Sequence, residues 1–179
     1  MIYTGANALE TKFCGPEANI TLKKGVIEGY ASLFGAKDQG GDEVQKGAYT
    51  ASLKRQKSGV KMLWQHDPTC PIGVWDEVRE DANGLYVKGR ILSEVQAGRE
   101  ALALMEAGAV DGLSIGYRTV RSEKSGSGGR LLHEVELWEV SVVTFPMLPE
   151  ARATASIDED ETFAKGLAEV LNAARDIMA

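Results

Sequence analysis

The sequence predicts a mainly β, α+β fold in which an antiparallel β-barrel is surrounded by helices. Short segments that alternate apolar and polar residues, separated by turns rich in glycine, account for most of the chain up to residue 145. Helical spacing of apolar residues is clear in one segment of that region, and one further short helix is expected. A closed or nearly closed antiparallel barrel suits this content of many strands and few helices.

The first half of the chain is expected to consist mainly of strands. The expected elements are, in order, one or two strands over residues 20–33, a polar loop over 37–47, a short helix over 47–56 and a strand over 60–65. A hairpin is expected over residues 73–92, because Asn83-Gly84 between two alternating segments is a strong turn signal.

The second half is expected to begin with the clearest helix, over residues 93–108. Ser93 is its expected cap, with Gln96 three residues later, and Gly108 suits its end. The expected elements that follow are a strand over residues 110–120, a mobile loop over 122–129, the longest strand over 131–145, ended by Pro146 and Pro149, and a linker over 151–157. We therefore expect one main domain over residues 1–155 and a C-terminal amphipathic helix over residues 156–179.

Composition limits the function classes. The chain has 179 residues and a net charge of −6, without a basic run, which argues against a nucleic-acid partner. Cys14 and Cys70 are too few for a disulfide framework, which favours a reducing compartment. Neither a signal-peptide pattern nor an apolar run of about 20 residues occurs, so no membrane association is expected.

Three residues suggest a serine hydrolase. Ser114 lies between Gly112 and Gly116, and glycine lets other backbone approach a hydroxyl closely. His66 in Trp-Gln-His-Asp is a candidate base for that hydroxyl. Glu139 is the sole carboxylate on its face of an apolar strand, and a buried acid needs a partner such as an imidazole.

The Gly-x-Ser-x-Gly string also matches the nucleophile elbow of α/β-hydrolases, but its surroundings do not. In that fold a strand leads into a helix at the serine. Here a helix is expected before Ser114 and a strand after it. The only acid between Ser114 and His133 is Glu123, in a polar loop. We therefore reject that fold.

Each candidate also has an interpretation without catalysis. Ser114 could bond a backbone carbonyl, and a histidine at a strand end is most often a surface residue. Glu139 could pair with an arginine such as Arg118 at the sheet rim. Asp67 is an unsuitable partner for His66, because successive strand side chains point to opposite faces.

Two other residues compete with these candidates for a role in the site. His133 is six residues from Glu139, roughly 20 Å along a strand, so both cannot serve one site, and we expect His133 to be exposed. Cys70 is a rival nucleophile, although a small buried thiol is the commoner role. No cluster has metal-ligand spacing, and the glycine-rich segments lack the residues of a phosphate loop, so no cofactor is expected.

Several short strings occur together in the order typical of one family. They are Lys46-Gly-Ala-Tyr49, Met62-Leu-Trp-Gln-His-Asp67, Pro71-Ile-Gly-Val-Trp75, Gly84-Leu-Tyr-Val87, Gly112-Leu-Ser-Ile-Gly-Tyr117 and Glu136 through Pro146. On these strings the chain resembles the prohead maturation proteases of tailed bacteriophages, over roughly residues 25 to 153. It is more distantly similar to herpesvirus assemblins, whose His-x-x-Cys-x-Val-Gly-x-Val segment compares with residues 66–74.

The resemblance implies specific roles. Ser114 would be the nucleophile, His66 the general base and Glu139 the third member, at the place where assemblins carry a second histidine. The chain lacks the Gly-Arg-Arg oxyanion motif of assemblins. The implied function is a serine endopeptidase that cleaves scaffold and capsid proteins inside the procapsid, in the host bacterial cytoplasm, with self-processing. The alternative is a non-catalytic capsid-assembly or scaffold module.

The C-terminal segment offers a surface for a partner. Phe163, Leu167, Val170, Leu171 and Ala174 form an apolar stripe behind the acidic residues 158–161. Such a stripe buries against the enzyme's own domain or against another chain, so self-association through this helix is a further expectation.

Overall fold

The computed structural model describes residues 10–13, 21–38, 40–56, 59–126, 128–144 and 154–155. In these residues a single ten-stranded sheet carries two helices, so the mainly β, α+β class is confirmed. The strands are β1 (Glu10–Phe13), β2 (Thr21–Lys23), β3 (Val26–Leu33), β4 (Glu43–Val44), β5 (Lys61–Trp64), β6 (Asp67–Glu80), β7 (Gly84–Ile91), β8 (Gly112–Lys124), β9 (Arg130–Val143) and β10 (Thr154–Ala155), and the helices are α1 (Thr50–Arg55) and α2 (Gln96–Glu106).

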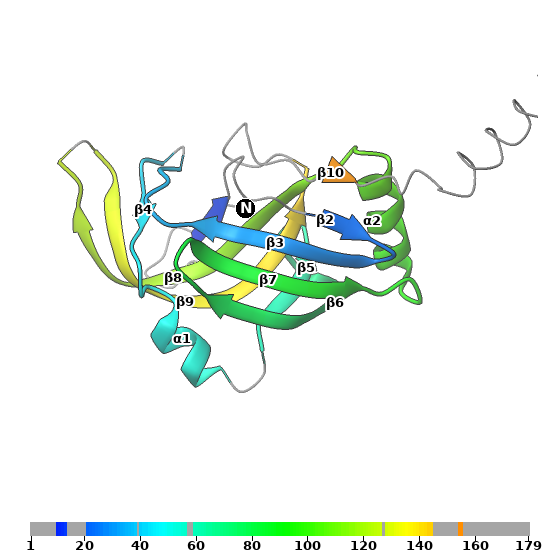
Figure 1. The fold of residues 1–179 in the computed structure, drawn as a ribbon, viewed down its shortest axis with the longest axis horizontal. Helices are drawn as coiled ribbons and strands as arrows, with labels where there is room; N and C mark the ends of the chain where they lie inside the picture. Colours follow the sequence, from blue (N-terminus) through cyan, green and yellow to red (C-terminus); the bar gives the residue numbers. More distant parts are fainter. Residues whose placement is uncertain are drawn as a thin grey trace, which may run out of the picture.

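The expected closed antiparallel barrel is wrong. The strand order is β1-β8-β9-β5-β6-β7-β3-β2-β10, with β4 paired to β9, and among the described residues no pairing joins the two ends of this order. The sheet is also mixed, because β5 runs parallel to β9 and β10 runs parallel to β2. Figure 1 shows β3, β7 and β6 crossing in front of β8, β9 and β5, with α1 and α2 at opposite ends. The sheet is therefore strongly curved and open.

Most of the expected elements of the first half are present. The expected strands over 20–33 are the β2–β3 pair, the short helix is α1, and the expected hairpin is β6–β7. Three short strands were not expected: β1 near the N-terminus, β4 inside the polar loop and β10 inside the linker. Alternation within these three short segments is too brief to distinguish them from the surrounding loops.

The start of α2 differs from the expectation. The helix begins at Gln96, its N-cap is Val95, and the cap has no side-chain hydrogen bond. Ser93 instead lies inside a turn in which the Val95 N–H donates to the Leu92 carbonyl. The capping-box prediction at Ser93 is therefore wrong, because the chain makes that turn before it becomes helical.

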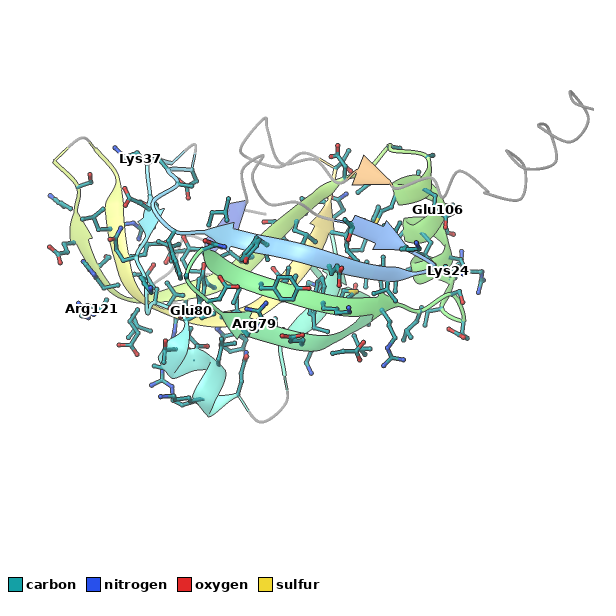
Figure 2. All side chains as sticks on the ribbon, viewed as in Figure 1. Lys24, Lys37, Arg79, Glu80, Glu106 and Arg121 are labelled. Atoms are coloured by element: carbon teal, nitrogen blue, oxygen red, sulfur yellow. The ribbon has the colours of Figure 1, made fainter. Side chains whose placement is uncertain are left out.

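The β8–β9 hairpin is longer than expected. The strands extend to Lys124 and from Arg130, so the expected loop over residues 122–129 is reduced to a tight connection. Across the two strands Arg118 forms an ion pair with Glu136, and the His133 Nε2 lies 2.5 Å from the Glu123 Oε1. Figure 1 shows this hairpin projecting from one end of the sheet, and Arg121 lies on it in Figure 2. Opposite charges on the two strands thus face each other where the β8–β9 ladder continues through a polar sequence.

A cluster of charges joins β1 and the loop before β4 to this hairpin. Arg130 pairs with both Asp42 and Glu10. Glu10 also accepts hydrogen bonds from the backbone N–H and the hydroxyl of Thr119. Burial raises the pKa of Glu10, but the hydrogen bonds from Thr119 and Arg130 outweigh it and lower that pKa. The ionised form of Glu10 therefore holds β1 against β8.

One continuous hydrophobic core lies inside the curve of the sheet and under α2. The largest of its fully buried side chains come from β3, from β5 to β9 and from the segment before α1; they include Ile27, Tyr49, Met62, Ile72, Leu85, Leu113, Ile115, Leu132 and Leu137. The expected helix over residues 156–179 and the prolines Pro146 and Pro149 lie outside the described residues. Among the described residues no helix is long and apolar enough to cross a membrane.

The end of β6 is tied to the start of α1 by one carboxylate. Glu80 accepts hydrogen bonds from the N–H of Gly47 at 2.5 Å, the N–H of Tyr49 at 3.0 Å and the hydroxyl of Thr50 at 3.1 Å. Figure 2 places Glu80 next to α1. Acceptance of backbone N–H groups at a helix start satisfies donors that have no partner inside the helix.

We expect Glu80→Ala to lower the free energy of unfolding by about 2 kcal/mol, because hydrogen bonds to a charged acceptor are lost and backbone donors are left without it. Glu77→Ala is the matched control, because the ion pair of Glu77 with Arg79 is exposed, and this substitution should cost about 0.5 kcal/mol or less. Denaturant unfolding of both variants measures the difference. Equal losses would show that Glu80 does not anchor α1.

Candidate active site

Ser114 lies on β8 and faces two side chains of β9. It is directly opposite Ser141 in the antiparallel ladder, and Gly116 is directly opposite Glu139. Residues that are directly opposite, and residues two apart along a strand, share one face of a sheet. Ser114, Ser141 and Glu139 are therefore neighbours on one face, where Ser114 and Ser141 are fully buried and Glu139 is 5% exposed.

His66 reaches the same face from the end of β5. The His66 Nδ1 lies 2.5 Å from the Glu139 Oε1. β5 runs parallel to β9 and ends with Trp64 beside Val142. The chain then turns back at once, because Asp67 pairs with Trp64, and the turn places His66 against Ser141 and Glu139. The predicted base and acid are thus in contact. Ser114 lies directly across the ladder from Ser141, which is two residues along β9 from Glu139.

His66 belongs to a tight turn with unusual backbone angles. Trp64 pairs with Asp67, so Gln65 and His66 are the two central residues of the β5–β6 hairpin. Both have positive φ, 52° and 62°, as the two-residue turn that joins antiparallel strands requires. This turn is usually made by Asn-Gly, so two larger side chains here indicate that their surroundings hold the backbone in place.

Several hydrogen bonds hold this turn against β9. The Gln65 N–H donates to the Val142 carbonyl at 3.0 Å, and the Gln65 amide donates to the Thr144 hydroxyl at 2.6 Å. The His66 N–H donates to the Ser141 Oγ at 3.1 Å. The imidazole side chain keeps 21% of its surface exposed, compared with 6% for the Glu139 side chain. The turn therefore presents the ring at the boundary between the buried acid and solvent.

Gly116 makes room for the acid. A Cβ at position 116 would lie 2.1 Å from the Glu139 Oε1 and within 3 Å of two further atoms of that side chain. Every side chain larger than hydrogen would therefore push the carboxylate away from its present position. The sequence interpretation of the flanking glycines, close approach to the serine, missed this role.

The alternatives considered from the sequence are placed elsewhere. Arg118 pairs with Glu136 and not with Glu139. Asp67 accepts hydrogen bonds from Thr69, as expected for a residue that does not orient His66. His133 pairs with Glu123 on the projecting hairpin, and it is partly buried, at 23% side-chain exposure, where we expected an exposed residue.

Cys70 is partly buried against the core, which agrees with a packing role. The described residues contain no group of three or more histidine, cysteine, aspartate or glutamate side chains placed to hold a metal ion. Trp64 also packs against the core.

Sequence reasoning missed Ser141, although its position two residues after Glu139 on the same strand face was a usable signal.

We expect Gly116→Ala to lower kcat on a peptide substrate at least about tenfold, because it displaces the Glu139 carboxylate from His66 and small misplacements of reacting groups are costly. Gly126→Ala is the control, since a Cβ there meets nothing within 4 Å. Steady-state kinetics with thermal melting measures both variants. Unchanged kcat in folded Gly116→Ala would contradict the assignment of Glu139 to the site.

The chain has clear relatives. A family model described as caudovirus prohead serine protease matches residues 16–166. The prohead protease of Enterobacteria phage HK97 is 35% identical over 158 residues, which are 86% of this chain and 68% of that protein. A capsid polyprotein of Pseudomonas phage PAJU2 is 33% identical over 123 residues, 64% of this chain but only 18% of the polyprotein.

A solved structure has a similar fold. The capsid assembly protease of bacteriophage T4 superimposes with a TM-score of 0.61 at 20% identity, covering 78% of this chain and 98% of that one. The family match spans most of the chain, including every residue of the candidate site. With a relative above 30% identity along most of its length, the chain belongs to the caudovirus prohead serine protease family.

Proposed function

We propose that Ser114, His66 and Glu139 are the catalytic triad of a serine endopeptidase that cleaves capsid and scaffold proteins inside a phage procapsid. The observation that carries this proposal is the 2.5 Å contact between the His66 Nδ1 and the Glu139 Oε1, on the face that Ser114 shares. The class of enzyme follows from the family, which consists of serine peptidases. The assignment of roles rests on the geometry.

The contact sets the protonation pattern that the reaction needs. A carboxylate only accepts hydrogen bonds, so the proton between the two groups is on Nδ1. The Nε2 of the neutral ring is then free of a proton of its own and can accept the Ser114 hydroxyl proton. Glu139 keeps this tautomer in place and stabilises the imidazolium that forms during the reaction.

The reaction then proceeds in two halves. The Ser114 Oγ attacks the carbonyl carbon of the scissile peptide while His66 takes its proton, and backbone N–H groups stabilise the oxyanion. His66 returns the proton to the leaving amine, which departs and leaves an ester on Ser114. Water, deprotonated by His66, hydrolyses this ester and restores the serine. Because Ser114 is fully buried, neighbouring residues of the protein must move aside before an extended substrate segment can reach it.

The substrate class is supported by the relatives. Their printed names are a prohead protease, a capsid polyprotein and a capsid assembly protease, and in the polyprotein the matching segment belongs to a larger capsid-related chain. We infer that this chain also acts on capsid and scaffold proteins, inside a procapsid assembled in the bacterial cytoplasm. Self-processing and self-association through residues 158–179 stay predictions.

Incubation with the cognate capsid protein and scaffold tests the proposal and the nucleophile together. We expect specific products by gel electrophoresis and mass spectrometry, and none with Ser114→Ala, which lacks the attacking oxygen. Cys70→Ala should stay within a few-fold of the parent rate, because the Cys70 thiol has a packing role. An intact substrate with the parent chain would favour the non-catalytic assembly module, and an inactive Cys70→Ala beside an active Ser114→Ala would replace the serine by the cysteine.

The acid is tested by Glu139→Gln with His133→Ala as the matched control. Loss of the triad acid in well-studied serine proteases costs about four orders of magnitude, and we expect at least a tenfold loss of kcat here, because the amide cannot stabilise the imidazolium. His133→Ala should change kcat little, since His133 pairs with Glu123 on the projecting hairpin. The opposite ranking of these variants by steady-state kinetics would transfer the third role to His133.

A further inference from the structure

Ser141 contacts both partners of the His66–Glu139 pair. Its hydroxyl accepts the His66 N–H at 3.1 Å and donates to the Glu139 Oε2 at 2.6 Å. A serine hydroxyl has one proton to donate and lone pairs to accept with. We propose that Ser141 is a positioning residue that fixes the backbone of the base and the carboxylate of the acid at the same time; this inference rests on the proposed triad.

The base needs such a support because its backbone is strained. A left-handed backbone conformation is disfavoured for residues other than glycine, and His66 and Gln65 are both in that region. Such residues persist where the surrounding structure over-determines them. The hydrogen bond to Ser141 fixes the backbone N–H of His66 directly. It therefore also fixes the position from which the imidazole side chain extends.

The acid needs the support because it is buried. One oxygen, Oε1, accepts from His66, and the other, Oε2, accepts from Ser141. A buried carboxylate oxygen without a donor carries a desolvation penalty, and a carboxylate held by one oxygen can rotate about its last bond. With Ser141 on Oε2, Oε1 stays directed at the imidazole.

The matched pair Ser141→Thr and Ser141→Val isolates the hydroxyl. Both variants add similar bulk at a fully buried position in a strand, and they differ by the hydroxyl alone. We expect kcat on a peptide substrate to be at least about tenfold lower for valine than for threonine, with KM unchanged within about threefold, because Ser141 is fully buried and its hydroxyl bonds His66 and Glu139. If the threonine and valine variants do not fold, Ser141→Ala, which adds no atom, is compared with the parent instead.

Ser52 supplies a control for burial alone. It is 2% exposed, and its hydroxyl accepts the N–H of Leu137 on the same strand β9 at 2.9 Å. Ser52→Ala therefore removes a comparable buried hydrogen bond away from the triad. We expect it to lower the melting temperature with kcat unchanged. If Ser52→Ala lowers kcat as much as Ser141→Val or Ser141→Ala does, the effect is one of general stability and the proposal is overturned.

Proton NMR of the His66 Nδ1–H provides a readout that does not need turnover. A proton shared between an imidazole and a carboxylate resonates far downfield, and we expect this signal in the parent, in Ser141→Thr and in Ser52→Ala. Its loss or broadening in Ser141→Val supports the positioning role even if the parent cleaves no peptide, in which case only the proposed function fails. Equal signals and equal kcat for the threonine and valine variants would overturn the inference.

Discussion

Burial of the Glu139 carboxylate is the constraint on which the rest of the site depends. Glu139 is 5% exposed in an otherwise apolar part of β9, and an ionised carboxylate in such a place requires donors for both oxygens. The structure supplies one donor from a turn, His66, and one from its own strand, Ser141. Space for the group comes from the missing side chain of Gly116 on the next strand. One buried charge thus accounts for the residue types at three neighbouring positions.

Parallel pairing of β5 with β9 brings the turn that carries His66 to the strand that carries Glu139. In register, Lys61 lies beside Glu139 and Trp64 beside Val142, so the chain leaves β5 next to the carboxylate's strand and turns immediately. The turn then folds His66 back onto β9, where its N–H donates to the Ser141 Oγ and its ring contacts Glu139. The base can therefore come from a two-residue turn, while Ser114 and Glu139 come from the middle of paired strands. Strand positions fix side chains more precisely than long loops do.

The sequence carried enough information for the class of fold, most of the long elements and the three candidate residues, but not for the closure of the sheet. Alternation shows that residues 61–64 form a strand, but it does not show which strand they pair with. The parallel pairing with β9 and the open sheet were therefore missed. The same limit hid Ser141, whose importance appears only when His66 is placed beside it. Glu139 was identifiable because a lone carboxylate on an apolar strand face is informative without any partner. Ser93 failed as a cap because a turn through Val95 intervenes before the helix.

The Gly-Leu-Ser-Ile-Gly string illustrates how one pattern can have two physical causes. In a nucleophile elbow the glycines allow a sharp turn from strand to helix around the serine. Here residues 112–124 are one continuous strand, so the two-residue period places Gly112, Ser114 and Gly116 on one face. Gly116 is opposite Glu139, and its lack of a Cβ leaves the volume that the carboxylate fills. The glycine therefore serves the acid on the neighbouring strand, and the spacing of the string follows from the pleat of the sheet.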